Sequence, residues 1–369
     1  MRADGKHDLE PNFCPQTEEE AAAINRMPAT SMAASRDRRG DGKPDSGDPV
    51  KSARDAGACA AVQDYAQLAR PLWETVRART HEFKENRGGA APETIHAMRV
   101  ALRRLKALQW AYRPRLDAGV LTAEREVTRR LMRTAAGVRD WDITLALADE
   151  WVPRLTKARA TLSVVREDAV NSGIVGLARH ARDIDASVVL QIPMCAELVN
   201  ATTSSPVDLV FLAGRLSKAR KQLRTCEKKA VRDGHYDALH AVRKAGKRVR
   251  DLYSLITSYT EAQFIVARHA VHADAMHRSS ADMMDVPAVK KSKKRNRWAA
   301  KLLTKRQIKR LQRVQSRFGA LNDAVASATL LRTICKRSSR FARTPGIERL
   351  IHTLDDVAQK YERKATSLL

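Results

Sequence analysis

Apolar residues recur with a period of about 3.6 along almost the whole chain from Gly57 to the C-terminus, and strand-like alternation is rare. Leu, Ala, Arg and Val dominate this region. The hydrophobic fraction of 43% is enough to build a sizeable core. We therefore predict an all-α fold of roughly eight to ten helices, arranged as two helical bundles.

Turn-forming residues divide this region into helices and into two halves. The stretch Gln191–Pro206 is the predicted boundary between a first half, about 57–190, and a second half, about 206–369. Ser205 followed by proline favours a helix start there, because serine caps a helix and proline fits its first position. Shorter breaks are predicted at Arg87–Gly89, Arg113–Pro114, Gly137, Asp233–Gly234 and Thr344–Gly346.

The positive charge of the chain belongs to the helical region. The net charge is +26, whereas residues 1–55 hold nine basic and eleven acidic residues, so the remainder carries +28. A folded region this basic is destabilised by self-repulsion, which favours a polyanionic partner. Residues 1–56 contain few aromatic or branched apolar side chains, and we predict that they form a flexible polar tail.

Two segments of the helical region repeat at a constant offset of 144 residues. Ile95–Lys106 and Leu239–Arg250 share His, Ala, Arg, a basic residue, Arg and a basic residue in register. Chance in a basic protein supplies fewer matches than this. The pattern therefore indicates an internal duplication that produced two pseudo-symmetric halves.

Each copy of the repeat places its basic residues along one face of a helix. Positions three and four residues apart form a stripe about 15 Å long, while the opposite face is apolar. Such a row of cations matches a row of phosphates, and the arginine fork binds phosphate oxygens in pairs. The candidate phosphate-binding residues of the two copies are His96, Arg99, Arg103, Arg104 and Lys106, and His240, Arg243, Lys247, Arg248 and Arg250.

A second pair of signals follows the repeat. Ala136–Asp140 is echoed by Gly319–Asp323, and a basic helix with i, i+3/i+4 spacing precedes each segment. We predict that the four basic stripes line a basic central groove, although the sequence does not show which stripes face one another. The further candidate phosphate-binding residues are Arg129, Arg133, Arg139, Arg306, Arg310, Arg313 and Arg317.

Three aspartates near these signals have two interpretations. Asp140, Asp142 and Asp323 follow glycine-containing segments, where an aspartate typically caps a helix. We expect this capping role, with Arg139 pairing locally with Asp142, and a metal site is the alternative. The tryptophans expected in the core are Trp110, Trp141 and Trp151.

The first copy of the repeat resembles the CHAD family, the conserved histidine α-helical domains. His96–Leu105 fits the family's H-x-x-R-V-x-x-R-R-L helix throughout, and an R-D-x-D-[IV] element follows it. The resemblance covers about residues 60–369, and the second half departs from it where Asn322 stands in place of arginine. It implies two pseudo-symmetric bundles with a basic central surface that binds inorganic polyphosphate, often with recruitment to polyphosphate granules.

We therefore predict non-catalytic polyphosphate binding by a CHAD-like helical domain over residues 57–369, with no cofactor and no metal. His96 and His240 have two interpretations, phosphate contact or packing at a helix interface. In the first, a neighbouring phosphate raises the imidazole pKa above its ordinary value of about 6.5, so acid strengthens binding.

Two other functions compete with this prediction. A nucleic-acid-binding protein directed at the phosphate backbone is the main alternative, although aromatic residues are only 5% and do not alternate with the basic stripes. An enzyme acting on polyphosphate is the second, but the chain has no G-x-x-x-x-G-K-[ST] loop. The run Lys290–Arg295 is either a polyanion-binding segment or a solvated loop.

The remaining features bear on location. The five cysteines have no zinc-site spacing, and no apolar run approaches the roughly 20 residues of a membrane span. We expect a cytoplasmic protein, located at polyphosphate granules and not associated with a membrane.

Overall fold

The computed structural model describes residues 49–86, 92–185, 207–274 and 302–369, which belong to one compact unit. Over these ranges the chain forms helices and turns without a strand, which confirms the predicted all-α class. The helices are α2 (Pro49–Glu85), α3 (Pro92–Tyr112), α4 (Ala118–Trp151), α5 (Thr156–Asp185), α8 (Leu209–Asp233), α9 (Tyr236–Asp274), α12 (Lys305–Arg337), α13 (Ser339–Ala342) and α14 (Ile347–Thr366).

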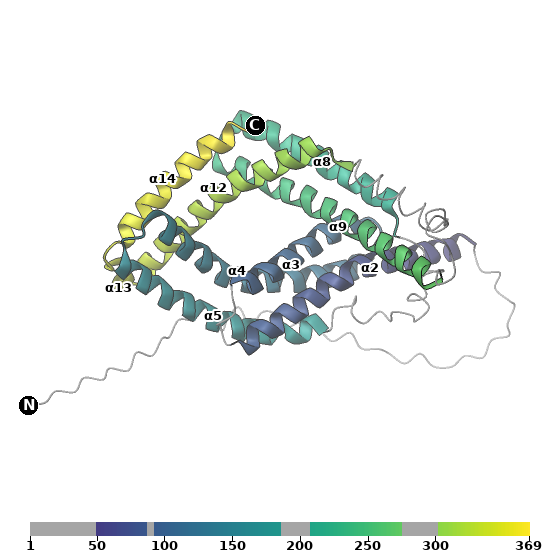
Figure 1. Cartoon of the computed structure of the whole chain (residues 1–369), viewed down its shortest axis with the longest axis horizontal. Coiled ribbons are helices and arrows are strands. Elements are labelled where there is room, and N and C mark those ends of the chain that lie inside the picture. The colour runs from purple at the N-terminus through teal and green to yellow at the C-terminus, as the bar shows by residue number, and fades with distance from the viewer. Residues whose placement is uncertain (1–48, 87–91, 186–206, 275–301) are drawn as a thin grey trace, which may run out of the picture. The chain divides into compact units, whose positions relative to one another are not determined.

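The long helices fall into two sets that follow one another along the chain, α2 to α5 and α8 to α14 (Figure 1). In the first set, α2 packs against α3 and α5, and both of these pack against α4. In the second set, α9 packs against α8 and α12, and α12 packs against α14, with the short α13 between them in the chain. Contacts of α3 with α9 and of α4 with α12 join the two sets.

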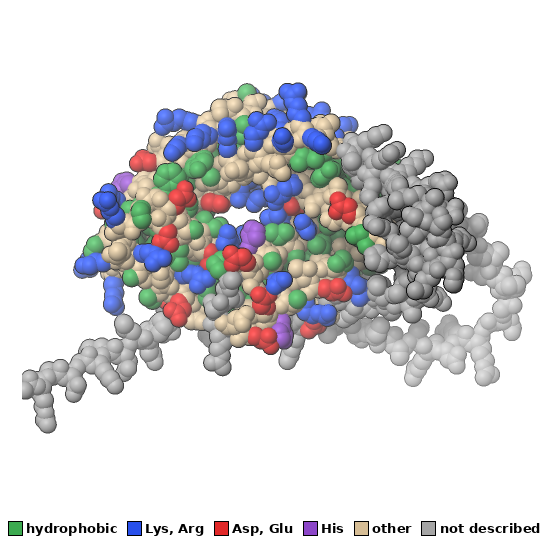
Figure 2. Space-filling model, viewed as in Figure 1, with side chains coloured by type: hydrophobic (Ala, Val, Ile, Leu, Met, Phe, Trp, Pro, Cys, Tyr) green, Lys and Arg blue, Asp and Glu red, His purple; other side chains and the backbone are tan. Residues whose placement is uncertain are grey.

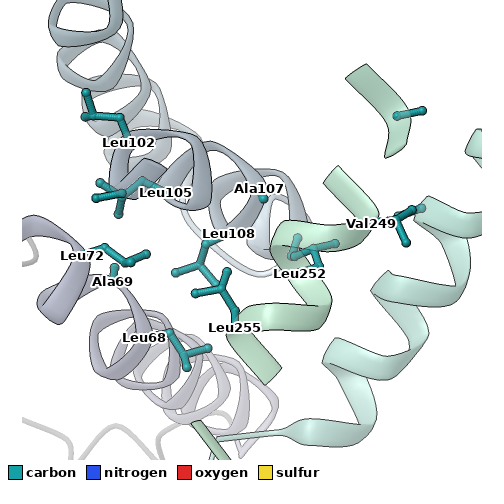
Figure 3. Close-up of a cluster of buried hydrophobic side chains, with 14 of the residues drawn as sticks. Leu68, Ala69, Leu72, Leu102, Leu105, Ala107, Leu108, Val249, Leu252 and Leu255 are labelled. Atoms are coloured by element: carbon teal, nitrogen blue, oxygen red, sulfur yellow. The ribbon is translucent and has the colours of Figure 1, made fainter. Parts of the chain in front are cut away.

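Apolar side chains from both sets build two buried clusters. The buried face of α3 includes Met98, Leu102 and Leu105, as its 3.6-residue period predicts. Figure 3 shows one cluster to which three helices contribute, and its labelled residues are Leu68, Ala69 and Leu72 of α2, Leu102, Leu105, Ala107 and Leu108 of α3, and Val249, Leu252 and Leu255 of α9. Because close packing allows little freedom, this cluster fixes the position of α3 relative to α9.

Three predicted helix breaks within the described residues are confirmed. Helix α3 ends at Tyr112, directly before the predicted break at Arg113–Pro114. Helix α8 ends at Asp233, and Gly234 follows in the left-handed conformation with φ of 67°, which glycine adopts without strain. Gly346, with φ of 94°, precedes helix α14.

The predicted break at Gly137 is wrong, because helix α4 runs through this residue. Leu131, Ala135 and Val138 on either side are buried against neighbouring helices. Their packing outweighs the cost of about 1 kcal/mol that glycine brings to a helix interior.

Several sequence predictions lie outside the described residues. They concern the tail over residues 1–48, the break at Arg87–Gly89, the boundary over 191–206 with its helix start at Ser205, and the basic run Lys290–Arg295. Helix α2 begins at Pro49 rather than near Gly57, so the helical region starts earlier than predicted. The N-cap of α8 is Asp208, whose side chain accepts a hydrogen bond from the Phe211 amide.

Two glycines on packed helices provide a matched test of the α4–α5 contact. A Cβ on Gly173 of α5 would lie 2.5 Å from Cγ2 of Val138, whereas a Cβ on Gly137 would meet nothing within 4 Å. We expect Gly173→Ala to lower the free energy of unfolding by about 1–3 kcal/mol through overpacking. Gly137→Ala should instead raise it by roughly 0.5–1 kcal/mol.

Urea unfolding followed by circular dichroism measures both changes. Adding Val138→Ala to Gly173→Ala should recover part of the loss, because it removes the clashing methyl group. Equal shifts in the same direction for the two single variants would contradict the packing of α4 on α5.

Candidate functional site

Four helices from the two sets meet around one pocket, here called the central pocket. Its volume is about 210 Å³, and α3, α4, α9 and α12 supply its walls. Figure 2 shows the same region as a hollow bordered by Lys and Arg side chains, with acidic side chains and a histidine among them. The lining residues are His96, Arg99, Val100, Arg103, Arg139, Asp140, Ile143, Arg243, Lys247, Asn322, Asp323, Ala326 and Ser327.

Many of the lining residues occupy equivalent positions in the two repeated segments. Arg99 and Arg243, like Arg103 and Lys247, are separated by the offset of 144 that relates α3 to α9. The lining residues of α4 and α12 follow an offset of 183, as in Asp140 and Asp323. Thr144 and Ser327 have this offset too, and the threonine hydroxyl donates a hydrogen bond of 2.9 Å to the serine. The duplication stays a prediction, but residues at equivalent positions of the two repeated segments lie close together at the central pocket.

The cations of the pocket divide into anchored and free side chains. Nε of Arg103 lies 2.8 Å from Oδ2 of Asp251, a carboxylate whose side chain is 3% exposed. Arg243 lies 3.6 Å from the Asp323 carboxylate. Within the described ranges, Arg99 and Lys247 have no carboxylate oxygen within 4 Å.

Two guanidinium nitrogens of the pocket are buried without a hydrogen-bond partner among the described residues. They are Nη1 of Arg99 and Nε of Arg243. An unsatisfied buried donor costs about 1–3 kcal/mol, and more when it is charged. The pocket therefore holds donors that an anionic ligand would satisfy.

Burial, together with neighbouring charges, changes the pKa of several groups in the pocket. Burial, followed by the nearby Arg243 and Arg103, lowers the pKa of Lys247 to about 7. Burial also lowers the pKa of Arg99 and raises the pKa of Asp140. Each shift disfavours the charged form, and a bound negative charge would oppose the shift for the cations.

The two histidines of the repeat occupy different surroundings. His96 lines the central pocket, where partial burial and then Arg139 and Arg103 lower its pKa. His240 lies beside the Tyr236 ring, at 5.8 Å between ring centroids, and is not among the residues that line the pocket. Burial and then Lys244 and Arg243 lower its pKa as well. Both imidazoles are therefore less easily protonated in the free protein than an ordinary histidine.

Six of the seventeen candidate residues predicted from the sequence line the central pocket, and eleven do not. The six are His96, Arg99, Arg103, Arg139, Arg243 and Lys247. The eleven are Arg104, Lys106, Arg129, Arg133, His240, Arg248, Arg250, Arg306, Arg310, Arg313 and Arg317.

Several of the eleven make structural contacts elsewhere. Arg104 donates to the Ser254 hydroxyl at 3.1 Å, Arg310 pairs with Glu227 at 3.1 Å, and Arg317 donates to the Lys364 carbonyl at 3.1 Å. Both Arg129 and Arg133 pair with Glu126, and Arg250 lies 3.8 Å from Asp251. Arg306 and Arg313 are exposed on α12.

The capping role predicted for three aspartates is wrong. Asp140 and Asp142 lie inside α4, and Asp323 lies inside α12, because neither glycine-containing segment breaks its helix. Asp140 and Asp323 line the pocket instead. Asp142 is buried, 2.8 Å from Arg166 and 3.8 Å from Arg139, which confirms the predicted pair with Arg139.

The tryptophans are only partly in the core. Trp141 is buried, as predicted. Trp110 and Trp151 are half-buried, and cations lie over their rings. For Trp110 the spacing could have indicated this, because Trp110 follows Arg103 by seven residues and Lys106 by four on α3, in line with the basic stripe.

The candidate residues predicted from the sequence do not include the polar and apolar residues between the cations, such as Asn322, Ser327 and Ile143. The offset of 183 makes Asn322 the equivalent of Arg139, a candidate residue, so this signal could have located Asn322 in the pocket. Among the described residues, no three His, Cys, Asp or Glu side chains are grouped as metal ligands. None of the described helices is long and apolar enough to span a membrane.

Comparison with known proteins identifies the family. No curated protein matches the chain. A crystal structure of the CHAD domain from the plant Ricinus communis superimposes with a TM-score of 0.55 at 17% identity, covering 83% of this chain and 88% of that one. The CHAD domain family model matches residues 72–286, more than half of the chain. The chain therefore belongs to the CHAD family.

Proposed function

We propose that this chain binds inorganic polyphosphate in the central pocket, without catalysing its turnover, and that it associates with polyphosphate granules in the cytoplasm. The CHAD family is associated with polyphosphate binding. One observation carries the proposal. Within the described ranges, the pocket cations Arg99 and Lys247 have no carboxylate oxygen within 4 Å. Phosphate oxygens suit both side chains, arginine as a planar fork and lysine as a point charge.

The geometry supports a ligand with several closely spaced negative charges. Arg99, Arg103, Arg243 and Lys247 come from two helices that a rigid core holds together. Each cation depresses the pKa of others, so a single weak anion would neutralise little of the repulsion. A phosphate chain offers one or more charges per phosphate and contacts the opposing stripes at once.

Backbone-directed nucleic-acid binding stays the alternative. The same cations accept nucleic-acid phosphates, and the two ligands differ in charge spacing and in the bases. No Phe, Tyr or Trp side chain lines the described central pocket, so among its lining residues only the His96 ring could stack on a base. Competition between the ligands is therefore the decisive measurement.

The first prediction concerns ligand preference. Labelled polyphosphate bound to the full chain should be displaced by unlabelled polyphosphate at a lower phosphate concentration than by single-stranded RNA or duplex DNA. Arg99→Gln and Arg243→Gln should each weaken polyphosphate binding about tenfold or more, because each removes a charge-assisted contact. The matched control is Arg337→Gln, an exposed residue at the end of α12, which should change the affinity less than twofold.

Equal or stronger displacement by a nucleic acid would place the alternative function first. Equal losses for Arg99→Gln and Arg337→Gln would show that net charge, and not the central pocket, determines binding.

The second prediction concerns alkaline pH. Lys247 in the free protein loses its proton as the pH rises through about 7. It faces Arg243 of its own helix, Arg99 and Arg103 of α3, and Asp323 of α12. Bound phosphate favours the charged form of Lys247. The contribution of Lys247 to the binding affinity is therefore constant below pH 7 and weakens as the pH rises above 7. The affinity should fall by up to about tenfold per pH unit in that window.

Titration of polyphosphate between pH 6 and pH 9 checks this expectation. Lys247→Met should flatten the alkaline slope with weaker binding throughout, and Lys247→Arg should flatten it with binding retained, because arginine stays charged. An unchanged slope in both variants would assign the titration to another group.

The third prediction concerns acidic pH and the histidines. The pKa of His96 is lowered in the free protein, and a bound phosphate favours the charged imidazole. Binding therefore takes up a proton and strengthens as the pH falls. His96→Gln should reduce this acid enhancement more than His240→Gln, since only His96 lines the central pocket. Polyphosphate binding measured from pH 5 to pH 7 tests which variant loses more of the acid enhancement. A double variant with the wild-type pH dependence would show that neither histidine causes the enhancement.

A further inference from the structure

A second group of cations lies where α3, α8 and α9 meet, and its members surround one tryptophan. This Trp110 cluster consists of Lys106 and Trp110 of α3, Arg215 of α8, and Lys244 and Arg248 of α9. The guanidinium carbon of Arg215 lies 4.3 Å from the Trp110 ring centroid, and that of Arg248 lies 4.8 Å from it. Both arginines are thereby held in defined positions.

The cluster has no negative counter-ion. Over the described residues, no carboxylate oxygen lies within 4 Å of Lys106, Arg215, Lys244 or Arg248. Arg215 donates to the Trp110 carbonyl and Arg248 to the Gln222 side chain, which are both neutral acceptors. Nε of Arg215 is buried and has no partner within the described part of the chain. Ordinary exposed helices mix charges of both signs, so this cluster is built differently from a solvated surface.

Burial and mutual repulsion both disfavour the charged forms of cations in the cluster. Burial, followed by Arg129, Lys244 and Arg248, lowers the pKa of Lys106. Burial and then Arg248 lower the pKa of Arg215. No acidic group raises either value, in contrast to the central pocket, where Asp140 and Asp323 do so for Arg99 and Arg243.

The cluster continues the cationic stripe of the central pocket. On α3, spacings of three and four residues lead from Arg103 through Lys106 to Trp110, so the three side chains share one helix face. At a rise of 1.5 Å per residue, Trp110 lies roughly 10 Å along the axis from Arg103. A ligand that fills the central pocket and extends along this face therefore reaches the cluster, whereas a ligand of only a few phosphates does not.

We propose that the Trp110 cluster is a second phosphate-binding subsite, which only a long polyphosphate chain reaches from the central pocket and which therefore gives the protein a preference for long chains. This inference rests on the proposed function. It assigns Arg215, Lys244 and the Trp110 ring to a site that the sequence motif alone does not include.

The test compares two ligands and three forms of the full chain. Affinities for tripolyphosphate and for a long-chain polyphosphate are measured by calorimetry for the wild type, for Lys106→Gln/Lys244→Gln, and for the control Lys336→Gln/Arg337→Gln. The control removes the same charge from exposed residues in the last turn of α12. A second cluster variant, Arg215→Gln/Arg248→Gln, is accepted only if its circular dichroism spectrum and melting match the wild type.

Both cluster variants should keep the wild-type affinity for tripolyphosphate within twofold and lose about tenfold or more for the long chain. The slope of log affinity against log salt for the long chain should fall by about one for each cation removed. The control should change neither affinity ratio.

Equal losses for both ligands, or no loss for either, overturn the subsite. Failure of the wild type to bind tripolyphosphate and the long chain alike overturns the proposed function itself, and the two failures are thus distinguished. An equal loss of long-chain binding in the control also overturns the subsite, because it assigns the effect to net charge.

Discussion

The repulsion between like charges in the central pocket is the constraint on which the rest of the structure depends. Arg99, Arg103, Arg243 and Lys247 are brought together on two helices, where burial and then the neighbouring arginines lower the pKa of Lys247. Apolar packing provides the opposing force, because the cluster shared by α2, α3 and α9 keeps the two stripes from separating. Like charges are thus held together at the expense of stability, and under the proposed function a bound polyanion returns that free energy.

The acidic residues near the pocket limit this cost without removing the site. Asp251 is buried and holds the Arg103 guanidinium at 2.8 Å, so that side chain is fixed before a ligand arrives. The Asp323 carboxylate lies farther from Arg243, at 3.6 Å, and Asp140 makes no ion pair with Arg99 within 4 Å. Some cations are therefore preorganised by a counter-ion while others keep free donors. Preorganisation of this kind lowers the entropy that binding must overcome.

The sequence predicted the helical class and the basic faces of two helices, but not how those faces are arranged. Helical periodicity and the repeated basic stripe depend on local spacing, so the all-α class and the faces of α3 and α9 follow from the chain alone. Which stripes face each other depends on long-range packing, and spacing contains no information about it. Six candidates line the central pocket, while others make contacts between helices elsewhere, such as the ion pair of Arg310 with Glu227. Gly137 was misjudged because tertiary packing outweighed its low helix propensity.

The paired composition of the central pocket also bears on the kind of chain that fits it. Arg99 with Arg243, and Arg103 with Lys247, present similar cations from two helices of opposite halves. An inorganic polyphosphate chain is chemically the same from either end, whereas a nucleic-acid strand has a direction set by its sugars. Under the proposed function, these two pairs of cations offer similar contacts to a polyphosphate in both orientations, although His96 and Arg139 have no histidine or arginine counterpart in the pocket. A nucleic-acid strand does not have the same contacts in both orientations, because its bases and sugars face different pocket residues when the strand is reversed.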